Sequence, residues 1–523
     1  MKRFRIPDWL LLLAFCAFFF LWKLSSFGLI GADEPRYAQV AREMLERHDW
    51  ITPTLGGTAW LEKPPLYYWQ AMVAYNFFGV HDWAARLPSV FDASVLLFGV
   101  YWFLGRFRAE VRRDGALMLA CSAGMVGYAR AASMDMPLAA AFTIAMLAWY
   151  AWLDRGARLH LSLFYALLAL AMLAKGPVAP FLAALIIALF AAVRRDWKVA
   201  LRTLWPPAIL LFCIVGLPWY ILVQLRNPQF FRVFILEHNL ARFGTNLFHH
   251  PEPFWYYVPV TLLAWIPATI FVIVALVRAI RQPGKREADA MNLFLILWIA
   301  VVVLFFSTSQ SKLPGYVLPA IPPGILLLAH YLCEMSAQRP RLAPIFMHSA
   351  LAAAFVFSAF ALRSVLLQHR LRWDSTAIVW LIVAFAVGLS VGVLLRKVGI
   401  GGLRFATIIP AMITLAIVLR LGASALNETL SARAVIEALS QLAPKQLPVA
   451  VVLVPRETEF ALQFYRHQKD IPRYELRQAP AGAHLLVARA GFKNAFARNI
   501  PGRRIDYLGN FPAQNLEFFY VGP

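Results

Sequence analysis

The sequence is poor in charged residues, and in acidic residues above all. Charged side chains make up 15% of the 523 residues, and 28 Asp and Glu stand against 50 Lys and Arg, which gives a formal net charge of +22. Soluble globular domains carry about 25% charged residues, so the composition excludes an ordinary member of that class. With 60% hydrophobic residues and a mean hydropathy of +0.62, the sequence predicts a polytopic membrane protein.

Cysteine is also scarce. The four cysteines fall inside apolar stretches, and the sequence has neither a CxxC pair nor a Cys/His cluster. We interpret them as buried thiols, which leaves the redox compartment open. Most Lys and Arg lie in short clusters between apolar stretches, as in retained cytoplasmic loops, so we predict no nucleic-acid partner. The sequence also has no internal repeat, which argues against an inverted-repeat transporter.

Long apolar runs are abundant, and they predict a mostly α-helical protein with about thirteen transmembrane helices. We expect these helices near residues 9–27, 84–105, 114–131, 135–153, 160–174, 177–193, 204–225, 255–279, 291–308, 315–335, 345–367, 375–396 and 402–424. The first run follows MKRFR, and we interpret it as an uncleaved helix. Alternation of Lys/Arg-rich and poorer connections predicts a cytoplasmic N-terminus, and the odd number of spans then puts the tail on the outer side.

The character of the sequence changes near residue 425. The tail contains two β-branched runs, VAVVLV and AHLLVARA, each followed by a stretch that could be helical, and a closing LEFFYVGP. We therefore predict a transmembrane domain of residues 1–425 and a small α/β domain of residues 426–523 on the outer side. The two large outer loops of the first domain are predicted at 28–83 and 226–254.

The first outer loop begins with LIGADEPRYAQVAREML. Its apolar residues recur at i, i+3, i+4, i+7 and i+8, which predicts an amphipathic helix suited to lying on the membrane surface with its polar face solvated. Asp33 fits an N-cap of that helix, and Glu34 complements the helix dipole. Asp33 therefore has two interpretations, a cap or a functional carboxylate.

Further ionisable residues are predicted on the same outer face. Glu62 and Lys63 lie between aromatic residues in WLEKPPLYYW, where Lys63 could also be a snorkelling lysine of an aromatic belt. Asp135, in ASMDMP, could also be a helix cap. The segments EHNLARF and SQSKLPGY add two pairs, His238 with Arg242 and Lys312 with Tyr316. We interpret Lys175, in AKGP, as a loop lysine beside a tight turn.

Ionisable groups clustered near membrane depth predict a functional site. Carboxylates with several cations suit a phosphate-bearing lipid, because Lys and Arg stabilise the phosphate while a carboxylate orients or deprotonates an attacking hydroxyl. A Glu/His set could bind a metal, but no HExxH or CxxC spacing supports this. A flippase or transporter of lipid-linked sugars is the non-enzymatic alternative. It would be expected to hold polar groups near the bilayer midplane, where Asp92 is the main ionisable residue.

Seven motifs occur in a fixed order over roughly the first 320 residues: ADEPRYAQVAREML, WLEKPPLYYW, MLAKGP, LPWY, EHNLARF, HHPEPFWYYVP and SKLPGYVLP. Together they resemble the bacterial lipid A aminoarabinose transferases and, more broadly, the polyprenyl-phosphate-dependent, protein O-mannosyltransferase-like glycosyltransferases. The resemblance implies a GT-C membrane fold in the bacterial inner membrane and a sugar donor carried on undecaprenyl phosphate. It also implies transfer on the periplasmic face to lipid A, another envelope glycan or a protein. The motif LEKPPLYYW differs from the corresponding motif of the aminoarabinose enzymes, which leaves the identity of the sugar and of the acceptor open.

The resemblance also implies roles for individual residues. Asp33 falls at the first-loop carboxylate of the superfamily, and Asp135 falls at its second aspartate. Binding of the donor's lipid phosphate is implied for Lys63, Arg242 and Tyr316, with Lys312, Arg36 and Tyr37 as additions. We expect the transfer reaction to require no cofactor. Glu62 and His238 match a pair linked to a bound divalent metal in the aminoarabinose enzymes, and metal-dependent catalysis is not inferred from them.

Overall fold

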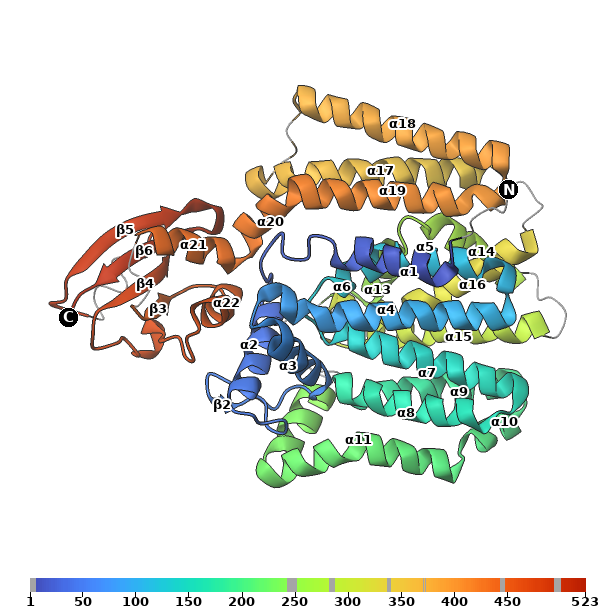
Figure 1. The fold of residues 1–523 in the computed structure, drawn as a ribbon, viewed down its shortest axis with the longest axis horizontal. Coiled ribbons are helices and arrows are strands. Elements are labelled where there is room, and N and C mark those ends of the chain that lie inside the picture. The colour runs from blue at the N-terminus through green and yellow to red at the C-terminus, as the bar shows by residue number, and fades with distance from the viewer. Residues whose placement is uncertain are drawn as a thin grey trace.

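A bundle of long helices carries a small sheet domain at one end, as Figure 1 shows for the computed structural model of the chain. The structure describes residues 6–241, 252–281, 287–335, 340–369, 371, 373–442, 447–492 and 500–523. The C-terminus lies in the sheet domain, and the N-terminus lies at the opposite end of the bundle.

Nine helical segments among the described residues are long and apolar enough to cross a membrane. They comprise α4 (Asp82–Phe107), α7 (Asp135–Arg155), α8 (Arg158–Lys175), α11 (Pro206–Arg226), α15 (Glu287–Thr308), η5 with α16 (Pro314–Ala320 and Ile321–Met335), α17 (Leu342–Gln368), α18 (Ser375–Val398) and the stretch through α19 (Leu403–Ile417) and α20 (Ala423–Leu430). The prediction of a mostly helical, multi-pass membrane protein is confirmed.

The predicted number of thirteen spans is not confirmed, although each predicted stretch overlaps helical structure. Two of the helices are short, α1 (Asp8–Cys16) and α9 (Val178–Val193). The stretch 114–131 is divided between α5 (Arg112–Ala120) and α6 (Ala123–Ala129). The stretch 255–279 bends by 115° between α13 (Tyr257–Ala264) and α14 (Thr269–Arg281). Further short helices of the bundle are η1 (Ala17–Leu21), η2 (Ala109–Val111), α10 (Trp197–Thr203), η3 (Arg232–Ala241), η4 (Phe254–Tyr256), η6 (Ile400–Gly402) and η7 (Val418–Gly422).

The helices divide into an inner and an outer set. In α7, 89% of the apolar window is buried, and this helix packs against α4 and α8. Its many alanines allow the close backbone approach that membrane helices use. In α17 and α18 only 17% and 22% of the windows are buried, and side chains such as Leu389 point outward. Outward-facing apolar side chains on long helices are what a lipid environment requires.

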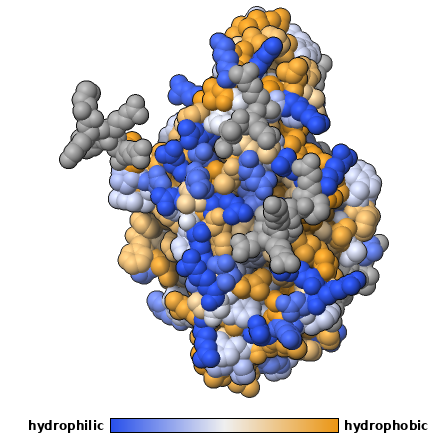
Figure 2. Space-filling view, turned by 90° about the vertical axis from the view of Figure 1, so that its right-hand side faces the viewer, coloured by the Kyte–Doolittle hydropathy of each residue, from blue (hydrophilic) through white to orange (hydrophobic). Residues whose placement is uncertain are grey.

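The end of the bundle opposite the sheet domain is polar. Figure 2 looks at this end, where hydrophilic residues gather across the middle of the face between hydrophobic flanks. α4 ends there and α8 begins there, with Arg106 and Arg158 in the terminal turns. The other end carries α2, α3 and the sheet domain (Figure 1), so the two ends of the bundle differ in structure.

The first outer loop folds into α2 (Asp33–Glu46), a hairpin of β1 (Thr54–Leu55) and β2 (Thr58–Ala59), and α3 (Leu66–Phe78). The predicted helix is confirmed as α2, but its predicted solvated polar face is wrong, because Gln39 is 0% exposed and Glu43 is 4% exposed. The hairpin covers that face: Glu43 accepts hydrogen bonds from Thr54 Oγ1 at 2.7 Å and from the backbone amide of Gly56 at 2.8 Å.

The C-terminal domain is a four-stranded sheet with two helices. The strand order is β3 (Val449–Val452), β4 (His484–Arg489), β6 (Leu516–Val521), β5 (Ile505–Phe511), and only the β3–β4 pair is parallel. α21 (Ala432–Leu442) and α22 (Arg456–Arg466) lie between the sheet and the bundle (Figure 1). The predicted small α/β fold is confirmed, and β5 was not predicted from the sequence.

Candidate functional site

Asp33 is the first residue of α2. Ala32 occupies the N-cap position, and no side chain caps the helix. The Asp33 carboxylate instead pairs with the guanidinium of Arg36, one turn along the same helix. The capping interpretation of Asp33 is therefore wrong. The Asp33 side chain is 48% exposed and that of Arg36 is 16% exposed. An accessible carboxylate is therefore paired with a largely buried cation.

Three aromatic rings enclose Arg36. Its guanidinium carbon lies 5.1 Å from the ring centroid of Trp60, 5.2 Å from that of Tyr37 and 5.7 Å from that of Phe460. A cation over aromatic faces at these distances is stabilised by their quadrupoles. Burial disfavours the charge of Arg36, but Tyr37, Asp33 and Glu62 together outweigh burial and raise its pKa. Arg36 is therefore held as a permanent cation beside Asp33.

Tyr37 belongs to a buried group of three tyrosines. Its ring centroid lies 6.1 Å from that of Tyr67 and 6.3 Å from that of Tyr68, both on α3. Burial, followed by the charge of Asp33, raises the pKa of Tyr37, so its hydroxyl stays protonated and can donate a hydrogen bond. The Tyr67 hydroxyl donates to the carbonyl of Ala85 at 2.8 Å and so ties α3 to α4.

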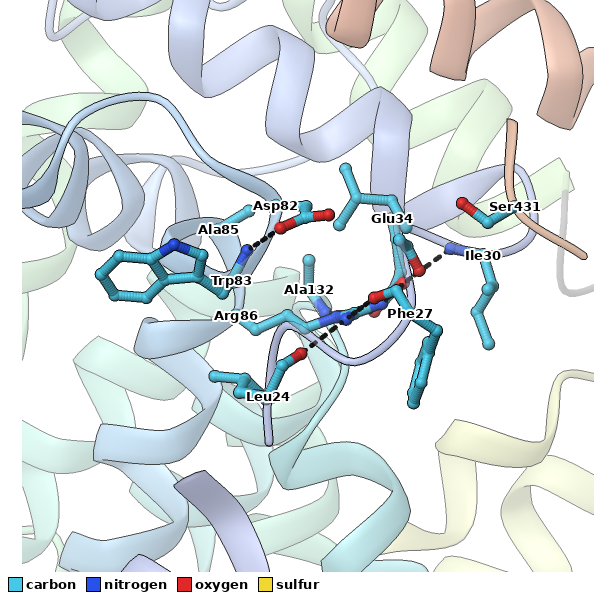
Figure 3. A network of polar contacts seen from close by, with 12 residues as sticks. Leu24, Phe27, Ile30, Glu34, Asp82, Trp83, Ala85, Arg86, Ala132 and Ser431 are labelled. Atoms are coloured by element: carbon cyan, nitrogen blue, oxygen red, sulfur yellow. Dashed lines mark hydrogen bonds and ion pairs between the residues drawn. The ribbon is translucent and has the colours of Figure 1, made fainter. Parts of the chain in front are cut away.

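A buried ion pair fixes the start of α2, as Figure 3 shows. Arg86 of α4 is 0% exposed and donates to the two carboxylate oxygens of Glu34 at 2.7 and 3.2 Å. Its guanidinium also donates to three backbone carbonyls at 2.8–3.1 Å, those of Leu24, Phe27 and Gly28. Glu34 accepts from the amides of Ile30 at 2.8 Å and Ala132 at 2.7 Å. The pair therefore joins α2, α4 and the segment that precedes α7.

Asp135 is the first residue of α7, three residues after Ala132. Its N-cap position is occupied by Met134, and no side chain caps α7, so the capping interpretation of Asp135 is also wrong. The carboxylate accepts a hydrogen bond from Ser133 Oγ at 2.7 Å and pairs with Lys175 Nζ. A Cβ atom on Gly315 would lie 2.7 Å from Asp135 Cγ, so glycine leaves the room that this carboxylate occupies.

Lys175 is the site residue that the sequence interpretation missed. It is the last residue of α8 rather than a loop lysine, and its side chain is 14% exposed. Besides pairing with Asp135, its Nζ lies 4.2 Å from the ring centroid of Tyr316. A lysine in the apolar motif MLAKGP needs a partner near membrane depth, and that requirement is the signal that could have identified it.

Electrostatic interactions connect the two carboxylates. Tyr37 and Tyr128 of α6 each interact with both Asp33 and Asp135. Lys63 also interacts with Asp135. The structure therefore brings Asp33, Lys63 and Asp135 into one neighbourhood, together with Tyr128, which was not predicted from the sequence.

Of the predicted phosphate ligands Lys312 and Arg242, the structure describes only Lys312. Lys312 is 6% exposed, and its Nζ donates to the carbonyls of Ser309 at 2.6 Å and Glu252 at 3.0 Å. It therefore joins the chain before Tyr316 to the chain before α13. Arg242 lies outside the described residues.

The two residues of the predicted metal pair, Glu62 and His238, lie side by side. Glu62 Oε1 lies 3.6 Å from His238 Nε2. Protein metal sites commonly use three or four ligands, and the described residues contain no group of three or more His, Cys, Asp or Glu that could hold a metal ion. Glu62 and His238 therefore supply two ligands among the described residues, fewer than such a site commonly uses.

Fold and site together define the class: a multi-pass membrane protein with a GT-C fold and an ionisable site at the end of the bundle that carries the sheet domain. The crystal structure of ArnT from Cupriavidus metallidurans bound to undecaprenyl phosphate superposes with a TM-score of 0.78. The match covers 98% of this chain and 97% of that chain at 20% identity. The apo structure of the same protein gives a TM-score of 0.75.

Sequence comparison agrees with the fold. Residues 8–234 match the model of the dolichyl-phosphate-mannose-protein mannosyltransferase family. The undecaprenyl phosphate-alpha-4-amino-4-deoxy-L-arabinose arabinosyl transferase of Pseudomonas aeruginosa (strain UCBPP-PA14) is 32% identical over 63% of this chain and 60% of its own length. The Serratia proteamaculans (strain 568) protein of the same description is 31% identical over 62% and 59%. The chain spans about 60% of the length of these relatives, and the resemblance that the motifs predicted is confirmed.

Proposed function

We propose that this chain is a membrane glycosyltransferase. It moves aminoarabinose or a related sugar from an undecaprenyl-phosphate-linked donor to lipid A or another acceptor of the bacterial envelope. The observation that carries the proposal is a pair of carboxylates at one end of a membrane bundle, in which Asp33 forms an ion pair with Arg36 and Asp135 forms an ion pair with Lys175. The fold shared with an undecaprenyl-phosphate-bound protein supports the choice of donor.

The proposed topology puts the N-terminus in the cytoplasm and the site in the periplasm. It keeps a membrane domain of residues 1–425, with periplasmic loops 28–83 and 226–254, and a periplasmic domain of residues 426–523. Two observations support it: the termini lie at opposite ends of the bundle, and the hydrophilic end in Figure 2 lies away from the site. Basic residues favour the cytoplasmic side of a membrane.

Cations and hydrogen-bond donors bind the phosphate of the donor in this proposal. Lys63, Arg242 and Tyr316 are its principal ligands, and Lys312, Arg36 and Tyr37 are additional ones. Lys175 orients both Asp135 and the ring of Tyr316, with which it is in contact. Positive charge stabilises the departing lipid phosphate, so the phosphate leaves without full protonation.

Asp33 orients the acceptor in the proposed reaction. The acceptor oxygen attacks the anomeric carbon of the sugar, and the bond from that carbon to the lipid phosphate oxygen breaks with its electron pair going to the phosphate. If the acceptor is a hydroxyl, Asp33 takes its proton as general base. If the acceptor is a phosphate, as on lipid A, Asp33 acts as a positioning group. The exposure of the Asp33 carboxylate supports contact with an incoming acceptor.

Mass spectrometry of lipid A and other envelope glycans tests the proposal in a strain that lacks the gene. We expect one sugar to disappear and to return when the wild-type chain is supplied. Asp33→Asn should insert in the membrane at wild-type level and restore none of the sugar. If no glycan or glycoprotein changes on deletion, the transferase proposal is wrong. A sugar missing from a protein would instead favour the O-glycosyltransferase alternative.

A further inference from the structure

The C-terminal domain supplies one of the three rings around Arg36. Phe460 lies on α22, and its ring centroid is 5.7 Å from the guanidinium carbon. The other two rings, Trp60 and Tyr37, belong to the first outer loop. Phe460 is 8% exposed and belongs to the same apolar cluster as Tyr37. The environment of Arg36, and through it that of Asp33, is therefore incomplete without the C-terminal domain.

α22 is docked firmly along α2. Arg42 of α2 is 2% exposed and donates to the backbone carbonyl of Phe464 at 3.1 Å. The Tyr465 hydroxyl accepts from the amide of Leu29 at 2.8 Å and donates to Asp82 Oδ2 at 3.1 Å. Arg42 and Asp82 are buried polar groups, which are costly to leave without partners. The domain is therefore not loosely tethered to the bundle.

Two further contacts reach the start of α4 and the chain just before α2. Arg433 pairs with Asp82 at 2.9 Å, and the Asn427 side chain accepts from the amide of Gly28 at 2.9 Å. A Cβ on Gly28 would lie 2.3 Å from Ser431 Oγ, so the two segments approach as closely as a glycine allows. The C-terminal domain thus contacts α2 through α22 and the chain before α2 through Asn427 and Ser431.

From these contacts we infer that the C-terminal domain is a positioning element of the transfer site. Phe460 restrains the Arg36 guanidinium in the orientation in which it binds Asp33. The Asp33 side chain is 48% exposed, so its direction depends on the partner to which it is bound. A ring that limits rotation of Arg36 limits the positions of the carboxylate too. This inference rests on the proposed function, in which Asp33 orients the acceptor.

The experiment uses the purified full-length chain, with undecaprenyl-phosphate aminoarabinose as donor and lipid A as acceptor. Phe460→Leu keeps an apolar side chain but removes the ring face, and we expect kcat to fall about tenfold, the size of a desolvated cation–π contact. The KM for the donor should stay within about twofold, because Lys63 and Tyr316, two of the principal phosphate ligands in the proposal, are unchanged. Phe460→Trp restores a ring face and should recover most of the kcat.

Phe464→Leu is the matched control, since Phe464 is also buried on α22 and belongs to the same apolar cluster. It should lower kcat by less than about twofold. Equal losses in the two leucine variants, or a wild-type kcat in Phe460→Leu, would overturn the inference. If the wild-type chain transfers no sugar, the proposed function fails, and amide hydrogen exchange then tests the inference alone. Exchange in residues 30–40 should be faster in Phe460→Leu than in Phe464→Leu, and equal exchange would contradict the restraint.

Discussion

At Gly315, a single added methyl group should severely impair the proposed reaction. A Cβ there would lie 2.7 Å from Asp135 Cγ and Oδ2, and 2.9 Å from Oδ1. Non-bonded atoms of this kind prefer separations of about 3.5 Å, so the carboxylate must move by roughly 0.8 Å. Asp135 is bound to Lys175 and Ser133, and they must move with it. Because a misplacement of about 1 Å costs about 100-fold in rate, Gly315→Ala should lower kcat/KM by about that factor.

The assay for Gly315→Ala is sugar transfer by the purified chain, with elution from a size-exclusion column in detergent as the test of folding. Gly127→Ala is the control, because a Cβ on Gly127 would meet no atom within 4 Å. We expect that control to keep wild-type activity. If Gly315→Ala folds normally and its kcat/KM is within about threefold of the control, the reasoning that ties Asp135 to this space is refuted.

Two further substitutions test the scaffold and the missed lysine. Arg86→Met leaves the Glu34 charge buried without its cation, which should lower the free energy of unfolding by about 3–5 kcal/mol. A denaturant titration in detergent measures this loss. An unchanged midpoint of the titration would contradict the prediction. Lys175→Met removes the cation from Asp135 and should reduce transfer by about 10- to 100-fold, the worth of a charge-assisted hydrogen bond. Lys175→Arg should retain more activity than Lys175→Met, and equal activity in the two would show that the charge is not needed.

The fold was largely predictable because bilayer thickness sets the length of an apolar run, and every predicted run overlaps a helix. Breaks inside apolar runs were not predictable, because hydrophobicity continues through them. The division between α5 and α6 falls at Cys121 and Ser122, which interrupt no apolar pattern. The 115° bend falls at Pro267, a residue without a backbone N–H. This proline is an exception, because it is a sequence signal for a break in the helix.

The site was predictable in its residue types but not in its pairings. Asp33 and Asp135 were identified as candidate carboxylates, yet each also satisfied the rules for a helix cap, and local sequence could not separate the two interpretations. The partners decide between them, and those partners are distant in sequence. Lys175 is on the next helix after Asp135, and Phe460 is in another domain from Arg36. Likewise α2 had a regular amphipathic pattern, and only the docking of α22 and the hairpin explains why Glu43 is buried.

Two of the carboxylates in the described site are already paired with cations, and this bears on how a phosphate would enter it. Three acidic side chains, Asp33, Glu62 and Asp135, are accompanied by four basic ones, Arg36, Lys63, Lys175 and Lys312. Arg36 and Lys175 are already paired with carboxylates, so a phosphate could bind them only by sharing or displacing those partners. Buried charge without compensation is strongly disfavoured. In the proposed reaction the donor phosphate therefore competes with Asp33 for Arg36 and with Asp135 for Lys175. The two paired cations are then better suited to holding the carboxylates in place while the donor enters and leaves.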